Sequence, residues 1–204
     1  RKDSVPETRY FMTNAKETFF AHVRPLDSSY YQIEMKSDEG EVFIRFQVKK
    51  EDFYKGETFF VKCNQVWPLS NPYKFRTRDY FFRKEKDTII DNEGFEFYSL
   101  LYNKPKKAKR KKIAQLKSVM EKNTGYHKPV FLHPTAYEEW KKEKTFPNGI
   151  FKYRYYVEHT GDTTGIYRLK QIHQIVKFIS HEEDCEPLTM KIITIKSMRP
   201  RGYN

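Results

Sequence analysis

Between residues 42 and 48, apolar side chains occupy every second position of the chain. These positions are Val42, Ile44, Phe46 and Val48. A period of two is typical of a β-strand with one buried face. A similar run at 30–36 precedes it, and Gly40 can take the positive φ that a tight turn between the two runs needs. The pattern predicts a β-hairpin whose four alternating side chains face the core.

Most of the remaining chain consists of short apolar or aromatic runs bounded by proline, glycine, asparagine or aspartate. The runs lie at residues 19–24, 58–63, 73–83, 95–102, 152–158, 167–178 and 191–196. Runs of this composition and spacing are typical of strands. The sequence Asp-Asn-Glu-Gly at 91–94 predicts a second hairpin turn. One helix is predicted at 134–144, where Tyr137 and Trp140 have helical spacing.

A basic run interrupts this β pattern. Seven of the nine residues at 104–112 are Lys or Arg, and Ile113, Leu116 and Met120 follow at spacings of three and four. We predict a basic arm and a helix over 104–122. Residues 1–17 are polar and are expected to form a partly ordered lead-in. No Gly/Ser-rich linker divides the chain, so we predict a single β-rich domain over 1–204.

Composition and charge narrow the class of partner. Aromatic residues make up 17% of the 204 residues, which excludes a disordered tail, and the net charge of +12 favours an acidic partner such as nucleic acid. No apolar run approaches the ~20 residues that span a bilayer, so no membrane association is expected. The two cysteines, Cys63 and Cys185, form no CxxC pair. We expect free thiols in a reducing compartment and a nuclear or cytosolic protein.

The basic residues are the main candidates for a binding site. We predict phosphate contacts from the densest group and from a second basic stretch. The first comprises Lys106, Lys107, Lys109, Arg110, Lys111 and Lys112, and the second comprises Lys74, Arg76 and Arg78. Crowded cations gain free energy when bound phosphates release counterions. The run is also compatible with a solvated loop that serves solubility, or with a nuclear-localisation signal.

One short pattern suggests catalysis. Asp27 follows a proline, and Glu34 and Lys36 follow at the spacing of a PD…ExK nuclease motif. There two carboxylates hold a divalent cation and a lysine steadies the attacking water. Such a short match arises readily by chance in a chain that is 32% charged. A metal-dependent nuclease is therefore an alternative hypothesis, while the leading one has no catalytic residue, metal or cofactor.

Aromatic side chains suggest a further alternative. Phe151, Tyr153 and Tyr155 alternate along one predicted strand, and exposed rings can stack on single-stranded bases. Tyr98, Tyr153 and Tyr155 are also candidates for an aromatic cage around a methylated histone lysine. Ordinary packing within a sheet explains the same residues without a ligand.

Several segments resemble bromo-adjacent homology (BAH) domains, in particular those of the largest origin recognition complex subunit and its yeast silencing relative. The segments are residues 55–61, 95–105, 130–142, 151–160 and 169–176. The third is similar to that family's strand followed by a short helix carrying a tryptophan. Phe97 and Lys104 stand where the family has Trp and Arg.

The resemblance implies a distorted β-barrel-like module with short peripheral helices and no catalysis. It implies docking on nucleosomes through the histone surface and DNA phosphates. Other chromatin proteins are further possible partners, and silencing and replication origins are the implied settings. These expectations agree with the basic composition and with a nuclear location.

Overall fold

A computed structural model describes residues 8–16, 19–37, 42–69, 77–131, 134–181 and 193–196. The strands are β1 (Tyr10–Thr13), β2 (Phe19–Pro25), β3 (Tyr30–Ser37), β4 (Val42–Lys49), β5 (Thr58–Val61), β6 (Val66–Pro68), β7 (Tyr80–Lys84), β8 (Thr88–Ile90), β9 (Glu93–Phe95), β10 (Phe97–Tyr102), β11 (Gln115–Met120), β12 (Phe151–Val157), β13 (Thr163–Arg168), β14 (Val176–His181) and β15 (Ile193–Lys196). The helices are α1 (Lys50–Lys55), α2 (Pro105–Arg110) and α3 (Pro134–Glu143), with 3-10 turns η1 (Cys63–Gln65) and η2 (Thr77–Asp79).

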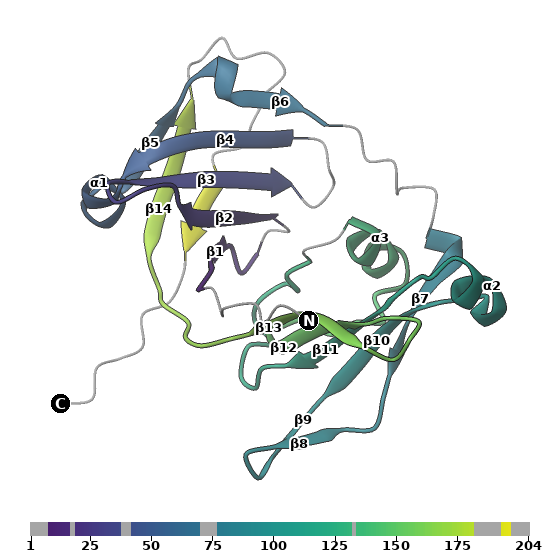
Figure 1. Ribbon diagram of the computed structural model, residues 1–204. Helices are drawn as coiled ribbons and strands as arrows, with labels where there is room; N and C mark the ends of the chain where they lie inside the picture. The colour runs from purple at the N-terminus through teal and green to yellow at the C-terminus, as the bar shows by residue number, and fades with distance from the viewer. Residues whose placement is uncertain are drawn as a thin grey trace.

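The first sheet has the strand order β1-β2-β3-β4-β6 and is antiparallel throughout. Its inner face packs against a three-stranded sheet of order β15-β14-β5, in which β14 runs parallel to β5 (Figure 1). Ile33 and Ile44 from the first sheet, Val61 from β5 and Ile179 from β14 share this core. As the alternation predicts, Ile44, Phe46 and Val48 are buried, and Val42 is partly buried against the same cluster.

The second five-stranded sheet has the order β13-β12-β11-β10-β7 and forms a separate core. One face of this sheet is covered by α3 and by Phe131 and Phe146, which pack among Leu116, Met120 and Trp140. The β8–β9 hairpin extends beyond the sheet (Figure 1). Asp91 and Asn92 both have positive φ at its tip, so the predicted turn is confirmed there.

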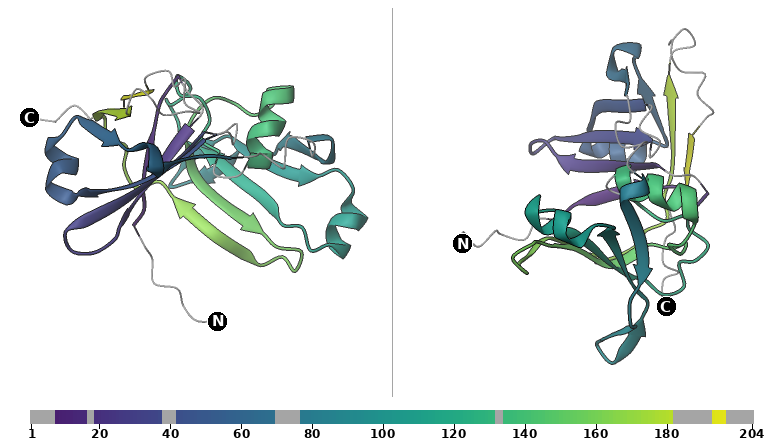
Figure 2. Two further views of the ribbon diagram at one scale, coloured as in Figure 1. Left: turned by 90° about the horizontal axis from the view of Figure 1, so that it is seen from above. Right: turned by 90° about the vertical axis from the view of Figure 1, so that its right-hand side faces the viewer.

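The two cores meet along β1. The Thr13 hydroxyl lies 2.7 Å from His127 Nε2, and the Lys128 amide donates to the Ala15 carbonyl at 2.8 Å. Phe11 packs edge-on to Tyr167 of β13. Because β14 returns to the first core after β13, a single cut of the chain would not separate the two cores (Figure 2). The single-domain organisation stays a prediction.

The chain is mainly β, as the sequence pattern predicts. Among the described residues every sheet is open, with two edge strands each, so a closed barrel is not observed there. The predicted helix at 134–144 is confirmed as α3. Residues 130–131 are not in a strand, contrary to the expectation that came with the BAH resemblance.

The predicted helix after the basic run is wrong. Residues 115–120 form β11, a central strand of the second sheet, and the helix of this region is the basic segment itself, α2. Leu116 and Met120 satisfy both periods, because positions four apart also share one face of a strand. Ser118 lies between them and is buried too. Strand pairing on both sides of β11 decided between the two periods.

Two further predictions need correction. The lead-in at 1–17 contains β1, whose Met12 is buried in the first core, while residues 1–7 lie outside the described part. The strand expected at 167–178 is instead the end of β13, an irregular stretch and the start of β14. The strand expected at 191–196 is present as β15.

Candidate nucleic-acid interface

The helix α2 forms the turn between the antiparallel strands β10 and β11 and lies at the periphery of the molecule (Figures 1 and 2). Pro105 stands in the first turn, where its missing N–H costs nothing. The helix ends in a Schellman motif: Lys112 has φ of 54°, its amide donates to the Lys109 carbonyl, and the Ile113 amide donates to Ala108. This cap turns the chain directly back into β11.

Most of the basic side chains of this turn are exposed. We define the α2 basic tip as Lys106, Lys107, Lys109, Arg110, Lys111 and Lys112. Only Lys107 is partly covered, with its ammonium 5.8 Å from the centre of the Tyr102 ring. None of the six is within ion-pairing distance of a described carboxylate. Because the tip contains no acidic residue, its positive charge is uncompensated by its own segment.

Two cations of β7, elsewhere on the second sheet, are neutralised. Arg83 binds Glu85 at 2.7 Å, and Lys84 binds Glu96 at 2.6 Å. Arg83, Ser99 and Lys117 together hold the pKa of Glu85 down to about 2. The α2 basic tip therefore differs from β7 in having exposed positive charge without an acidic partner.

The second predicted basic stretch is only partly visible. Lys74 and Arg76 lie outside the described residues, and Arg78 lies in η2, where its side chain is not described. Tyr80 pairs with Tyr102 across β7 and β10. The chain therefore passes from η2 into β7 at the same end of the sheet at which β10 leads into α2.

The structure does not bring the predicted cage residues together. Tyr98 pairs with Ser118 and faces the inner core, where it packs edge-on to Phe146. Tyr153 and Tyr155 pair with Val119 and Lys117, so they lie on the opposite face. The predicted stacking set is divided as well, because Phe151 lines the inner core with Met120.

The nuclease pattern is also divided, because Asp27 lies apart from Glu34 and Lys36, which share one face of β3. Asp27 accepts hydrogen bonds from the amides of Ser29 and Tyr30 and forms the turn before β3. Glu34 lies on β3 four positions beyond Tyr30, which corresponds to about 13 Å along a strand. Arg24 and Arg45 both pair with Glu34 at 3.2 and 3.1 Å. Within the described chain no group of three acidic, histidine or cysteine side chains is arranged to hold a metal.

Sequence reasoning missed Glu139, which is 2% exposed in α3. Its Oε2 atom has no hydrogen-bond partner, and burial raises the pKa of this carboxyl from its usual 4.5 to about 7. Buried carboxylates with such a pKa are candidates for functional sites. Glu139 directly precedes Trp140 in the sequence, and helical spacing does not identify it as a core position. Only the packing of α3 revealed that this position is enclosed.

Glu139→Gln should stabilise the protein in a pH-dependent way. A raised pKa means that the unfolded chain ionises first, so wild-type stability falls as the pH rises from 4.5 towards about 7. The full loss corresponds to about 3 kcal/mol. Denaturant unfolding at about pH 8 should show the variant more stable by up to that amount, and at about pH 4 nearly equal. A stability difference that does not change with pH would contradict this assignment.

Cys63 forms a disulfide bond, so the expectation of a free thiol is wrong. The other cysteine of the sequence, Cys185, lies outside the described residues. Disulfides persist mainly in oxidising compartments. The bond therefore removes the support that free thiols would have given to a reducing compartment.

The fold and the α2 basic tip define a mainly β protein with a peripheral cationic turn. Comparisons with protein-family models, curated proteins and solved structures find no match for the chain. None of the described helices combines the length and apolar character needed to cross a bilayer.

Proposed function

We propose that the protein is a non-enzymatic module that binds DNA through its phosphate backbone and docks on nucleosomes. The observation that carries this proposal is the α2 basic tip, whose cations have no ion-pair partner among the described residues. Crowded cations repel one another, and phosphates relieve that repulsion while counterions return to solution. The short, capped turn presents these charges at the end of β10 and β11, at the periphery of the molecule (Figure 1).

The sequence resemblance to BAH domains supports the nucleosome as the particular target. A barrel-like BAH arrangement, a nuclear location and contacts with other chromatin proteins belong to the same proposal. Phosphate contacts position a protein without reading bases. The proposed binding is therefore independent of DNA sequence, and the histone surface supplies the additional contacts.

A second candidate is favoured by the disulfide of Cys63. A chain that works in an oxidising compartment meets sulfated polysaccharides, which are linear polyanions that attract the same unpaired cations. The electrostatic argument for the α2 basic tip is the same for both polymers. The two targets differ because a nucleosome offers a histone surface beside its DNA, whereas a polysaccharide offers no protein surface.

Titrations of the intact protein over a series of salt concentrations test the proposal. The ligands are two DNA duplexes of unrelated sequence, a nucleosome and a heparin oligosaccharide. Phosphate contacts from the five exposed cations of the α2 basic tip, all except Lys107, should give a slope of log K against log salt of about −4 to −5, equal for both duplexes. The nucleosome should bind more tightly than either duplex at equal salt. Stronger binding of heparin than of the nucleosome would favour the second candidate, and a flat salt dependence would exclude both.

A further inference from the structure

Arg154 of β12 is buried without an acidic partner. Its side chain is 3% exposed, and no described carboxylate lies within ion-pairing distance of it. Its Nη2 donates a hydrogen bond to the Tyr156 hydroxyl at 2.9 Å, but the buried Nη1 has no hydrogen-bond partner. Burial lowers the pKa of this guanidinium. A buried arginine left in this way is costly, because the desolvated charge has no compensating anion.

Two tyrosine rings compensate part of this charge. The guanidinium carbon lies 5.6 Å from the centre of the Tyr156 ring and 5.8 Å from that of Tyr167. Such cation–π contacts stabilise a cation through the ring quadrupole. They do not satisfy the N–H donors of Nη1, since arginine carries only donors and needs an acceptor for each.

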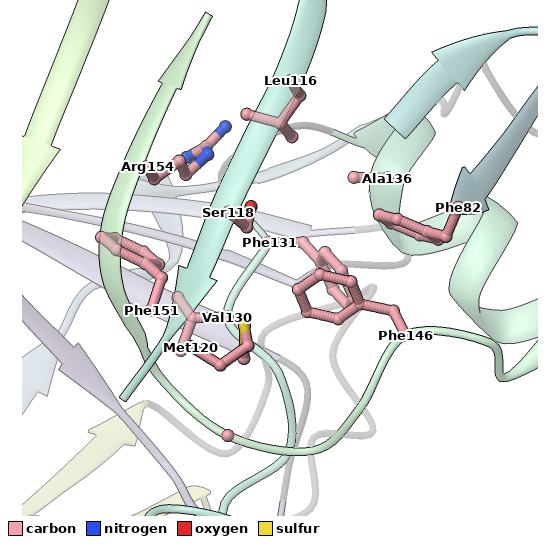
Figure 3. Close-up of a pocket in the computed structure, with 11 residues that line it drawn as sticks. Phe82, Leu116, Ser118, Met120, Val130, Phe131, Ala136, Phe146, Phe151 and Arg154 are labelled. Carbon is pink, nitrogen blue, oxygen red and sulfur yellow. The ribbon is translucent and has the colours of Figure 1, made fainter. Parts of the chain in front are cut away.

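A small cavity adjoins this guanidinium. Arg154 and Ser118 are paired across β12 and β11, face the same side, and both line the cavity (Figure 3). Its volume is about 10 Å³, room for a body about the size of one water molecule. The other lining residues are apolar, and several of them are aromatic, including Phe131, Phe146 and Phe151. Ser118 is also buried, and its hydroxyl makes no hydrogen bond to another described residue.

We propose that this cavity is a binding site for a small monatomic anion of the chloride class, held by the Arg154 guanidinium and the Ser118 hydroxyl. Both groups donate hydrogen bonds, and the positive edges of the surrounding rings add to the attraction. Room for about one water-sized body favours a monatomic anion over sulfate, phosphate or an organic carboxylate. A water molecule would fill the space but would leave the buried charge uncompensated.

Thermal unfolding in matched solutions of sodium chloride and sodium gluconate tests this site. A ligand that binds only the folded chain raises Tm with its concentration. Raising chloride to ten times its Kd should raise Tm by about 3–6 °C relative to gluconate at equal ionic strength. Equal Tm values in the two salts at all concentrations would overturn the proposal.

Two variants separate this site from general salt effects. Ser118→Ala should weaken the chloride dependence, and Arg154→Met should abolish it. The variant in which Lys109, Arg110, Lys111 and Lys112 are replaced by Ala should keep the full dependence, since the α2 basic tip is distant in the fold. Crystals soaked in bromide should show an anomalous peak beside Arg154. A chloride effect that persists in Arg154→Met, or a peak elsewhere only, would contradict the assignment.

Discussion

Replacing Lys109, Arg110, Lys111 and Lys112 with Ala should reduce the affinity for DNA by more than about a thousandfold at roughly 0.1 M salt. All four side chains are exposed and have no ion-pair partner among the described residues. Each lost phosphate contact should flatten the slope of log K against log salt by about 0.9, giving up to about 3 to 4 units in total. Thermal stability should barely change, because solvated cations contribute little to folding.

A control of equal charge distinguishes contacts from net charge. Ala in place of Lys49, Lys55, Lys62 and Lys86 removes the same charge from exposed positions outside α2. This control should keep nearly the wild-type slope and affinity. If instead the α2 variant binds with unchanged affinity and slope, the basic tip serves solubility or import. The DNA-facing surface would then be sought at Lys74, Arg76, Arg78, Arg83 and Lys84.

Phe46→Ala should destabilise the protein by about 3–5 kcal/mol, as expected for a buried phenylalanine. Phe46 is 4% exposed in β4 and its ring centre lies 5.8 Å from that of Phe59 on the facing sheet. Truncation removes apolar contacts and leaves a cavity between two sheets that cannot readily close. The free energy of unfolding from denaturant titration measures the loss.

The neighbouring Phe60→Ala is the matched control, because Phe60 is 78% exposed on β5. Its truncation should change stability by less than about 0.5 kcal/mol. Suppose that Phe46→Ala loses little stability and Phe60→Ala loses much. The opposite faces of β4 and β5 would then form the core.

Local sequence patterns correctly predicted two kinds of feature. These are strands with one buried face and turns that need positive φ. The alternation in β4 identified its buried residues correctly, since a period of two leaves one face for the core. The turn at Asp91 and Asn92 was also predicted, because these residue types tolerate positive φ. In β11 local spacing failed, because Leu116 and Met120 satisfy both periods and pairing with β10 and β12 decided the outcome.

The sequence by itself determined the β-rich character, the strand alternation and the high positive charge concentrated in residues 104–112. These follow from composition and from neighbours a few positions apart. Only the tertiary structure decided that Tyr98 lies on the opposite face of the sheet from Tyr153, and that Asp27 lies away from Glu34. Only the tertiary structure paired Ser118 with Arg154 beside a cavity. The physical reason is that strand register joins residues distant in sequence, and a shift of one position would reverse every face.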